Sequence, residues 1–270
     1  MSEEQILVDP RIFGKKVDFG RAADDYARHR AGFPPRFFER LAAQLDLRSG
    51  MRALDLGTGT GTVARGLAAL GLTVDGLDPS AELMEQAVAL GEAEGVEVAY
   101  TLGKAEAPPF PDASFDLVTA GQCWHWFDWP RAAAEAVRVL KPGGALVICH
   151  FDWIPLPGNI VEATEDLIRA YSPDWDLGRG NGVYGIWLAD LSNAGLTDIE
   201  TASFDVAQPY SHEGWRGRIR ASAGVKGSLD ADAVARFDAD LAAVLAARWP
   251  RDPLAVPHRV WWCAARKPAR

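Results

Sequence analysis

The chain has 270 residues, of which 48% are hydrophobic and 24% are charged, and its formal net charge is −9. This length and composition are typical of a soluble protein built as one large α/β domain, or as such a domain with an added cap. The negative charge argues against general binding to nucleic acid or anionic membranes, and no apolar run is long enough to cross a bilayer.

The few cysteines and histidines limit the chemistry further. The three cysteines stand far apart in apolar surroundings, which predicts buried thiols in a reducing compartment rather than disulfides or a zinc site. The five histidines lack ligand spacing, so we expect no metal. The first residues have no apolar leader-like segment. We therefore expect a cytoplasmic protein, present as a monomer or a homodimer.

In chain order, an irregular start is followed by helical periodicity over residues 21–46, interrupted by Gly32, Pro34 and Pro35. Strands and helices then alternate. We predict strands over residues 51–56, 72–78, 96–102, 115–121 and 144–151, and helices over 60–70, 80–90 and 129–140. This alternation indicates right-handed βαβ crossovers and a mostly parallel sheet.

After residue 151 the alternation becomes less regular. We predict helices near residues 160–171, 183–194, 211–223 and 229–248, and strands over 196–206 and 258–267. A C-terminal edge pair with one antiparallel strand would complete the sheet. The expected division is an N-terminal lid segment 1–45, a cofactor-binding core 46–152, a cap insertion 153–195, and a C-terminal part 196–270 that completes the sheet and adds acceptor-side helices.

The segment ALDLGTGTGTVARGLA, residues 53–68, places glycines between a buried strand and a helix. Glycine lets a backbone approach a ligand closely, and the free N–H groups of a helix start can bind that ligand. Asp55 precedes the turn, and Asp78 ends the next strand, where a carboxylate can accept both hydroxyls of a ribose. A tight turn without a ligand is one alternative. A dinucleotide fold is another, although it needs a glycine where Thr62 stands.

LDLGTGTG followed by LDPS resembles the signature of class I S-adenosylmethionine (SAM)-dependent methyltransferases, in particular small-molecule members of methyltransferase type 11. Residues 103–121 and 138–148 resemble further segments of that family. The resemblance implies a Rossmann-like, seven-stranded, mostly parallel sheet with one antiparallel strand, helices on both faces and a small helical cap. It also implies SAM as cofactor at the carboxyl ends of the strands, and S-adenosylhomocysteine (SAH) as product.

The same resemblance assigns cofactor contacts to four loops and to the N-terminal segment. They are Asp55, Gly57, Thr58 and Gly59 at the glycine turn, Asp78 and Pro79 after the second strand, Ala105 and Glu106 after the third, Gln122 after the fourth, and Tyr26 and Arg30 near the start. Asp55 and Gly57 would hold the methionine amino group, and Asp78 the ribose. A solvated Arg30 on an amphipathic helix is the alternative for that residue.

The stretch GQCWHWFDW, residues 121–129, follows the fourth strand and puts His125 where methyl donor and acceptor would meet. A histidine titrates near neutrality and can take a proton from an acceptor. Three interpretations remain open: a general base, a hydrogen-bonding partner of the substrate, or a structural residue.

The acceptor side gives weaker signals. We name as candidate substrate contacts His29, Trp124, Trp153, Tyr184 and Arg220. Packing in a cap core is the alternative for the aromatic residues, and surface charge is the alternative for Arg220, whose segment 210–224 faintly resembles relatives of trans-aconitate methyltransferase.

The resulting functional hypothesis is methyl transfer to an O or N atom of a small-molecule metabolite. The sequence shows no NPPY motif after the fourth strand, which argues against amino methylation of nucleic acids. Two alternatives are a SAM-binding protein of this fold with another reaction, and a nicotinamide-dependent oxidoreductase.

Overall fold

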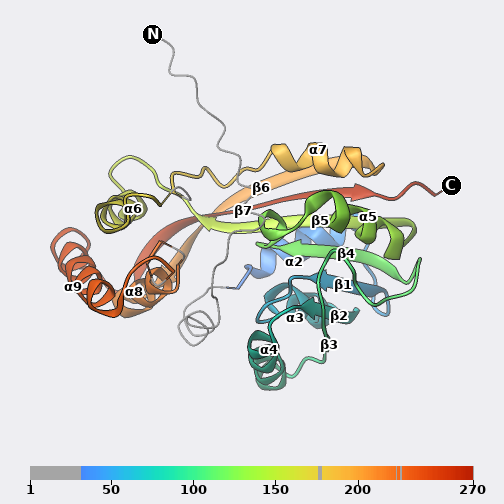
Figure 1. The fold of residues 1–270 in the computed structure, drawn as a ribbon, viewed down its shortest axis with the longest axis horizontal. Coiled ribbons are helices and arrows are strands. Elements are labelled where there is room, and N and C mark those ends of the chain that lie inside the picture. The colour runs from blue at the N-terminus through green and yellow to red at the C-terminus, as the bar shows by residue number, and fades with distance from the viewer. Residues whose placement is uncertain (1–31, 176–177, 223, 226, 270) are drawn as a thin grey trace, which may run out of the picture.

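The computed structural model describes residues 32–175, 178–222, 224–225 and 227–269 (Figure 1). Seven strands form one sheet: β1 Arg52–Leu56, β2 Thr73–Asp78, β3 Ala99–Leu102, β4 Phe115–Gly121, β5 Leu140–Trp153, β6 Thr197–Tyr210 and β7 Leu254–Arg266. The helices are α2 Pro35–Leu45, α3 Thr62–Ala69, α4 Ala81–Glu94, α5 Trp129–Val139, α6 Ile160–Tyr171, α7 Ile186–Asn193, α8 His212–Arg220 and α9 Ala231–Arg248, with a short 3₁₀ turn, η2, at Trp124–Trp126.

The strand order is β3-β2-β1-β4-β5-β7-β6. The strands from β3 to β5 are parallel to one another, and β7 runs antiparallel to both of its neighbours, β5 and β6. The predicted fold is therefore confirmed, including the single antiparallel strand. The order reverses between β1 and β4, and ligands of such sheets bind outside the carboxyl ends of the strands at this point.

Two hydrophobic clusters cover the two faces of the sheet. On one face, α5 and α7 pack through Ala132, Ala136, Trp187 and Leu191. On the other face, α2 and α3 pack through apolar residues that recur at helical spacing, such as Phe37, Leu41, Val63 and Leu67. The α2 helix begins at Pro35, where the fixed φ of proline suits a first helical turn. This layered packing places the carboxyl ends of β1, β2 and β4 next to one another along one edge of the sheet.

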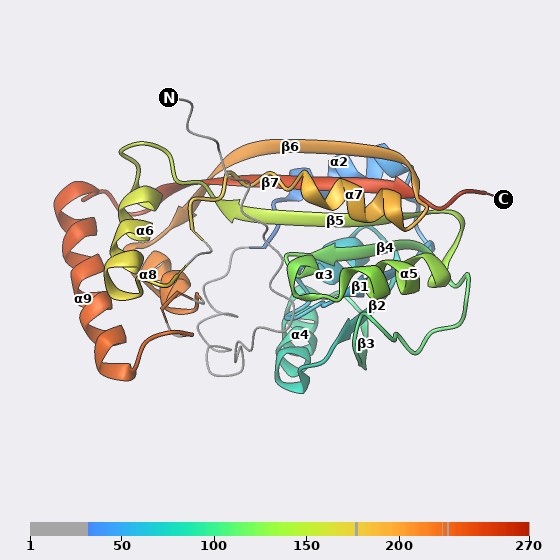
Figure 2. The same ribbon diagram turned by 45° about the horizontal axis from the view of Figure 1, so that its top comes forward.

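A third cluster lies beyond the core. Strands β5, β6 and β7 extend past the other strands, and α6, α8 and α9 gather at that end (Figure 2). The cluster is built around Trp215, Ile168, Phe237 and Leu241. It joins α6, from the predicted cap insertion, to α8 and α9 from the predicted C-terminal part, whereas α7 packs on the core. This packing favours a cap made of α6, α8 and α9; the domain division itself stays a prediction.

Strands β5, β6 and β7 are longer than predicted, and the prediction ended β6 at residue 206. In the structure β6 continues to Tyr210 and includes Pro209, which pairs with Ala255. Proline is tolerated there because β6 is an edge strand. Strand β7 begins earlier to match it. Strand β5 begins at Leu140, opposite Phe115, because a register shift accommodates the KPGG segment within the strand.

Within the described residues, no helix has the length and hydrophobicity that a membrane crossing requires.

Candidate active site

The glycine turn after β1 has the conformation that its sequence predicts. Gly57, Gly59 and Gly61 have φ values of 60°, 55° and 77°, a region that favours glycine. A Cβ atom at Gly57 would lie 2.9 Å from the Cys123 side chain, so this position has no room for a larger residue. A Cβ atom at Gly59 would meet no atom of the described residues within 4 Å. The backbone at Gly59 is therefore open to a ligand on the side where a side chain would stand.

Asp55 lies beneath this turn and is only 1% exposed. Its two carboxylate oxygens accept hydrogen bonds from the Thr119 hydroxyl at 2.6 Å and from the Thr58 hydroxyl at 2.7 Å. Burial raises the pKa of Asp55 to about 6, although these hydrogen bonds lower it. Both oxygens already have partners, so Asp55 supports the turn from below. Its predicted contact with a methionine amino group stays a prediction.

Asp78 links the turn to the end of β2. One carboxylate oxygen accepts the Gly59 N–H at 2.8 Å, and the other accepts the Ser80 N–H at 2.9 Å. Burial raises the pKa of Asp78, and these two backbone bonds lower it. A carboxylate offers about four acceptor positions, so each oxygen retains one for a further donor. This geometry can hold two vicinal hydroxyl groups. Pro79, the next residue, is exposed beside it.

The loops after β3 and β4 adjoin this edge. Ala105 is buried, and the carboxylate of Glu106 accepts the Asp128 N–H at 2.9 Å, so the loop after β3 is tied to the start of α5. Gln122 has a φ of 58°, and its side-chain amide donates to the Phe151 carbonyl oxygen. The loop after β4 is thus tied to the end of β5.

His125 lies in η2, directly after β4, and belongs to a group of aromatic rings. Its ring centroid is 5.6 Å from that of His150 on β5 and 5.2 Å from that of Trp126. His150 is 2% exposed, and its Nδ1 lies 3.3 Å from a carboxylate oxygen of Asp152. Two imidazoles and a carboxylate therefore stand together where β4 and β5 end.

Asp152 is the charged centre of this group. The Tyr184 hydroxyl donates to it at 2.8 Å, and the Tyr184 ring stacks on Trp187 at 4.2 Å between centroids. Burial alone would raise the pKa of Asp152, but His150, Tyr184 and His125 together lower it to about 2. Burial and the neighbouring carboxylate raise the pKa of Tyr184 well above its usual range, so its hydroxyl stays a donor. Asp152 is thus an anion at neutral pH.

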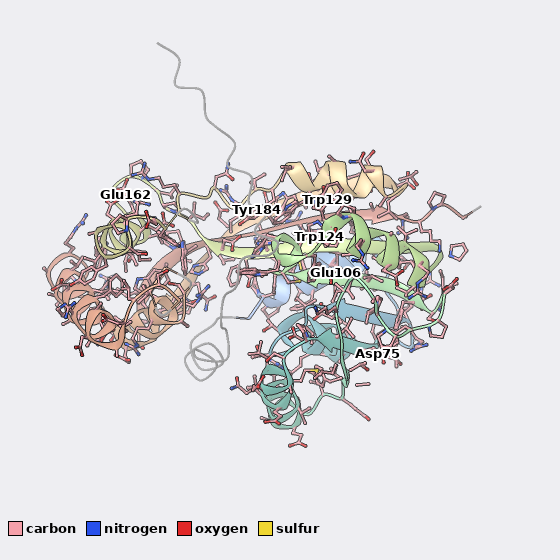
Figure 3. All side chains as sticks on the ribbon, in the orientation of Figure 1. Asp75, Glu106, Trp124, Trp129, Glu162 and Tyr184 are labelled. Atoms are coloured by element: carbon pink, nitrogen blue, oxygen red, sulfur yellow. The ribbon has the colours of Figure 1, made fainter. Side chains whose placement is uncertain are left out.

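The sequence-predicted substrate contacts have different surroundings. Trp124 is 1% exposed and donates its indole N–H to Asp190 at 3.0 Å, which makes it a core residue on the α5 and α7 side of the sheet (Figure 3). Arg220 pairs with the carboxylates of Asp238 and Glu213, at 2.6 and 2.7 Å. The predicted substrate contacts of both residues stay predictions.

Tyr184 and Trp153, by contrast, lie near the end of β5, where the polar group is located. Tyr26, His29 and Arg30 lie outside the described residues.

His150 and Asp152 are not among the residues predicted from the sequence. Both belong to HFD, at the end of the otherwise apolar strand segment ALVIC, and alternate residues of a strand share one face. Two polar side chains two positions apart, at the carboxyl end of a buried strand, were the signal that could have identified them.

The strand order, the glycine turn and the carboxylate after β2 together define an α/β protein that binds a nucleotide-containing cofactor. Comparison with known proteins narrows this class. Residues 54–148 match the family described as "Methyltransferase domain". The structure of the YcgJ protein from Bacillus subtilis has the same fold, with a TM-score of 0.56 at 23% identity over 86% of this chain and 98% of that one.

Two curated relatives are similar in sequence. An uncharacterized methyltransferase of Mycobacterium tuberculosis is 36% identical over 57% of this chain, and the match spans 62% of that relative's length. The 27-O-demethylrifamycin SV methyltransferase of Amycolatopsis mediterranei is 30% identical over 76% of this chain and 74% of its own length. The chain belongs to the class I SAM-dependent methyltransferases, whose cofactor is SAM.

Proposed function

We propose that this protein transfers a methyl group from SAM to an O or N atom of a small-molecule acceptor. The observation that carries the proposal is the common edge of the sheet. An open glycine backbone and a carboxylate with free acceptor positions follow β1 and β2, and an imidazole follows β4. A cofactor held at the first two elements would direct its reactive end toward the third.

The residues present fit this cofactor. Gly59 would lie beneath the adenosyl group, since its backbone is open on that side. Asp78 would accept the two ribose hydroxyls in the acceptor positions that Gly59 and Ser80 leave unused. Ala105 and Glu106 would border the adenine, and Gln122 would border the methionine end. When bound, SAM supplies a methyl group that its sulfonium already activates for transfer.

The chain's own contribution is alignment, exclusion of water and removal of a proton. His125 accepts the proton that leaves an oxygen or nitrogen acceptor. The negative charge of Asp152 stabilises the imidazolium that His125 then becomes, as a buried carboxylate does for a catalytic histidine. His150 lies between them and orients the group, because Asp152 holds its Nδ1.

The test is incubation of the protein with methyl-labelled SAM and a small-molecule extract, with mass detection of labelled products and of SAH. The proposal predicts a labelled small molecule formed together with SAH. Saturable binding of SAM without any labelled product would instead indicate a protein of this fold that runs another reaction. Binding of a reduced nicotinamide cofactor in preference to SAM would contradict the cofactor assignment.

A further inference from the structure

One arginine of α8 differs from its neighbours. Arg216 and Arg220 both form ion pairs with Asp238 of α9 and with Glu213. Arg218 lies between them in sequence but on another side of the helix, and it forms no ion pair within the described part of the chain. Its guanidinium instead lies over the ring of Trp153, 4.7 Å from the centroid. A partly buried arginine without a carboxylate partner is uncommon, because a buried charge costs free energy unless it is paired.

We propose that Arg218, stacked on Trp153, binds a carboxylate group of the methyl acceptor. This inference rests on the proposed function and narrows it, since it makes the acceptor a small organic acid. The Tyr210 hydroxyl accepts one N–H of Arg218, and a guanidinium whose face lies on an aromatic ring keeps its remaining N–H groups at its edge. That edge can donate two parallel hydrogen bonds to a carboxylate, a geometry that lysine cannot provide.

The aromatic ring beneath Arg218 is fixed in place. The indole N–H of Trp153 donates to Glu165 at 2.9 Å, and its ring contacts Trp215 edge-on at 5.6 Å. Glu165 is itself occupied, since its other oxygen accepts the Arg179 N–H at 2.7 Å. Both carboxylate oxygens of Glu165 thus have partners, and one of them holds Trp153. A side chain held before ligand binding loses little conformational entropy when the ligand arrives.

The location suits an acceptor. Trp153 is the last residue of β5 and follows Asp152 of the polar group, although the two side chains leave opposite faces of the strand. Burial lowers the pKa of the Arg218 guanidinium, and Tyr210 and Asp152 partly offset this effect. An acceptor whose carboxylate contacts Arg218 therefore binds at the end of β5, where Asp152 also lies.

The other groups that face Arg218 favour a singly charged ligand. His258 is 2% exposed, and burial lowers its pKa to about 4, so it is neutral at pH 7 and adds no positive charge. Tyr210 contributes a neutral hydroxyl. Asp152 is negative and would repel an anion, and this repulsion grows with the charge of the ligand. One arginine opposite one carboxylate thus matches a monocarboxylate better than a phosphate dianion.

The test uses the full chain saturated with SAH and two matched pairs of probes: phenylacetate with phenylacetamide, and butyrate with butyramide. Each pair has the same shape but differs in charge. Binding is followed by calorimetry and by ligand-observed NMR. We expect an acid to bind at least 10-fold more tightly than its amide. Equal binding of acid and amide, or no binding of either acid, would overturn the inference.

Variants identify the residue responsible. Arg218→Gln should abolish the preference for the acid, Arg218→Lys should retain part of it, and Arg216→Gln, which removes an equal charge from the same helix, should leave it intact. If Arg218 were only structural, Arg218→Gln would lower the melting temperature without changing the acid preference of the folded protein. The SAH titration that precedes each experiment keeps the two proposals apart, because absence of SAH binding contradicts the proposed function rather than the role of Arg218.

Discussion

The edge of the sheet after β1 and β2 differs in construction from the edge after β5. At the first, the side chain of Asp78 is held by backbone N–H groups that lie within twenty residues of it. At the second, Asp152 on β5 is held by Tyr184 from the segment before α7, and it neighbours His125 from the loop after β4. A local, backbone-built site suits a cofactor that does not vary, whereas a site assembled from distant side chains can change with the acceptor.

The largest effect on catalysis is expected at the edge after β5, which is assembled from side chains that lie far apart in sequence. His125→Ala should lower kcat by roughly 10²-fold or more, because it removes the group that accepts the proton, while SAH affinity stays nearly constant. Steady-state kinetics and SAH calorimetry measure the two quantities. His212→Ala, a histidine on α8 whose ring contacts the Arg251 carbonyl oxygen, is the matched control. Unchanged turnover in His125→Ala would reassign His125 to a structural role.

The next effect concerns the support beneath the glycine turn. Asp55 has a pKa of about 6 in the folded protein, above the ordinary value of 3.8. Between these pH values the folded protein binds the extra proton, so its stability should fall as pH rises through this window, by about 3 kcal/mol in total.

Urea unfolding at pH values from 4 to 7.5 measures this effect, and Asp55→Asn should lack it. If the unfolding free energies of the wild type and the variant changed in parallel with pH, burial would not raise the pKa of Asp55. Because many other groups titrate in this range, the difference between the two curves, rather than either curve, is the measured quantity.

A smaller change is expected where the cofactor sugar binds. Asp78→Asn should weaken SAH binding by about 2 kcal/mol, because an amide cannot accept hydrogen bonds at both of its ends. Asp75→Asn is the control from the same strand, since the Asp75 carboxylate pairs with Arg52 at 2.9 Å. Calorimetry should show weaker SAH binding for Asp78→Asn than for Asp75→Asn. Equal SAH affinities of the two variants would mean that the ribose does not bind at Asp78.

The smallest effect is expected at Tyr184. Tyr184→Phe removes the hydroxyl that donates to Asp152 but keeps the ring that stacks on Trp187. We expect a loss of about 1 kcal/mol in unfolding free energy and a reduction of a few-fold in kcat. A kcat loss as large as that of His125→Ala would mean that Tyr184 itself takes part in proton transfer.

These two edges also explain how much the sequence could predict. The glycine turn, Asp78 and the strand order follow from signals within short segments, and the structure has the predicted turn and topology. The spacing of His150 and Asp152 in β5 was a local signal, but their partners Tyr184 and His125 lie far from them in sequence, so no local pattern identifies those partners. The arginines of α8 show the same limit: only the packing of α9 decides that Asp238 pairs with Arg216 and Arg220, and among the described residues Arg218 forms no ion pair.

The most direct test is the affinity of SAH for two glycine variants. Gly59→Ala and Gly95→Ala both place a methyl group at a positive φ, of 55° and 69°, and in the part of the chain that the structure describes no atom lies within 4 Å of either methyl group. Their backbone strain is therefore similar, but only Gly59 faces the proposed cofactor site. The account predicts that the wild type and Gly95→Ala bind SAH equally and that Gly59→Ala binds it at least 10-fold more weakly. Equal affinity of all three proteins, or no binding by the wild type, would contradict it.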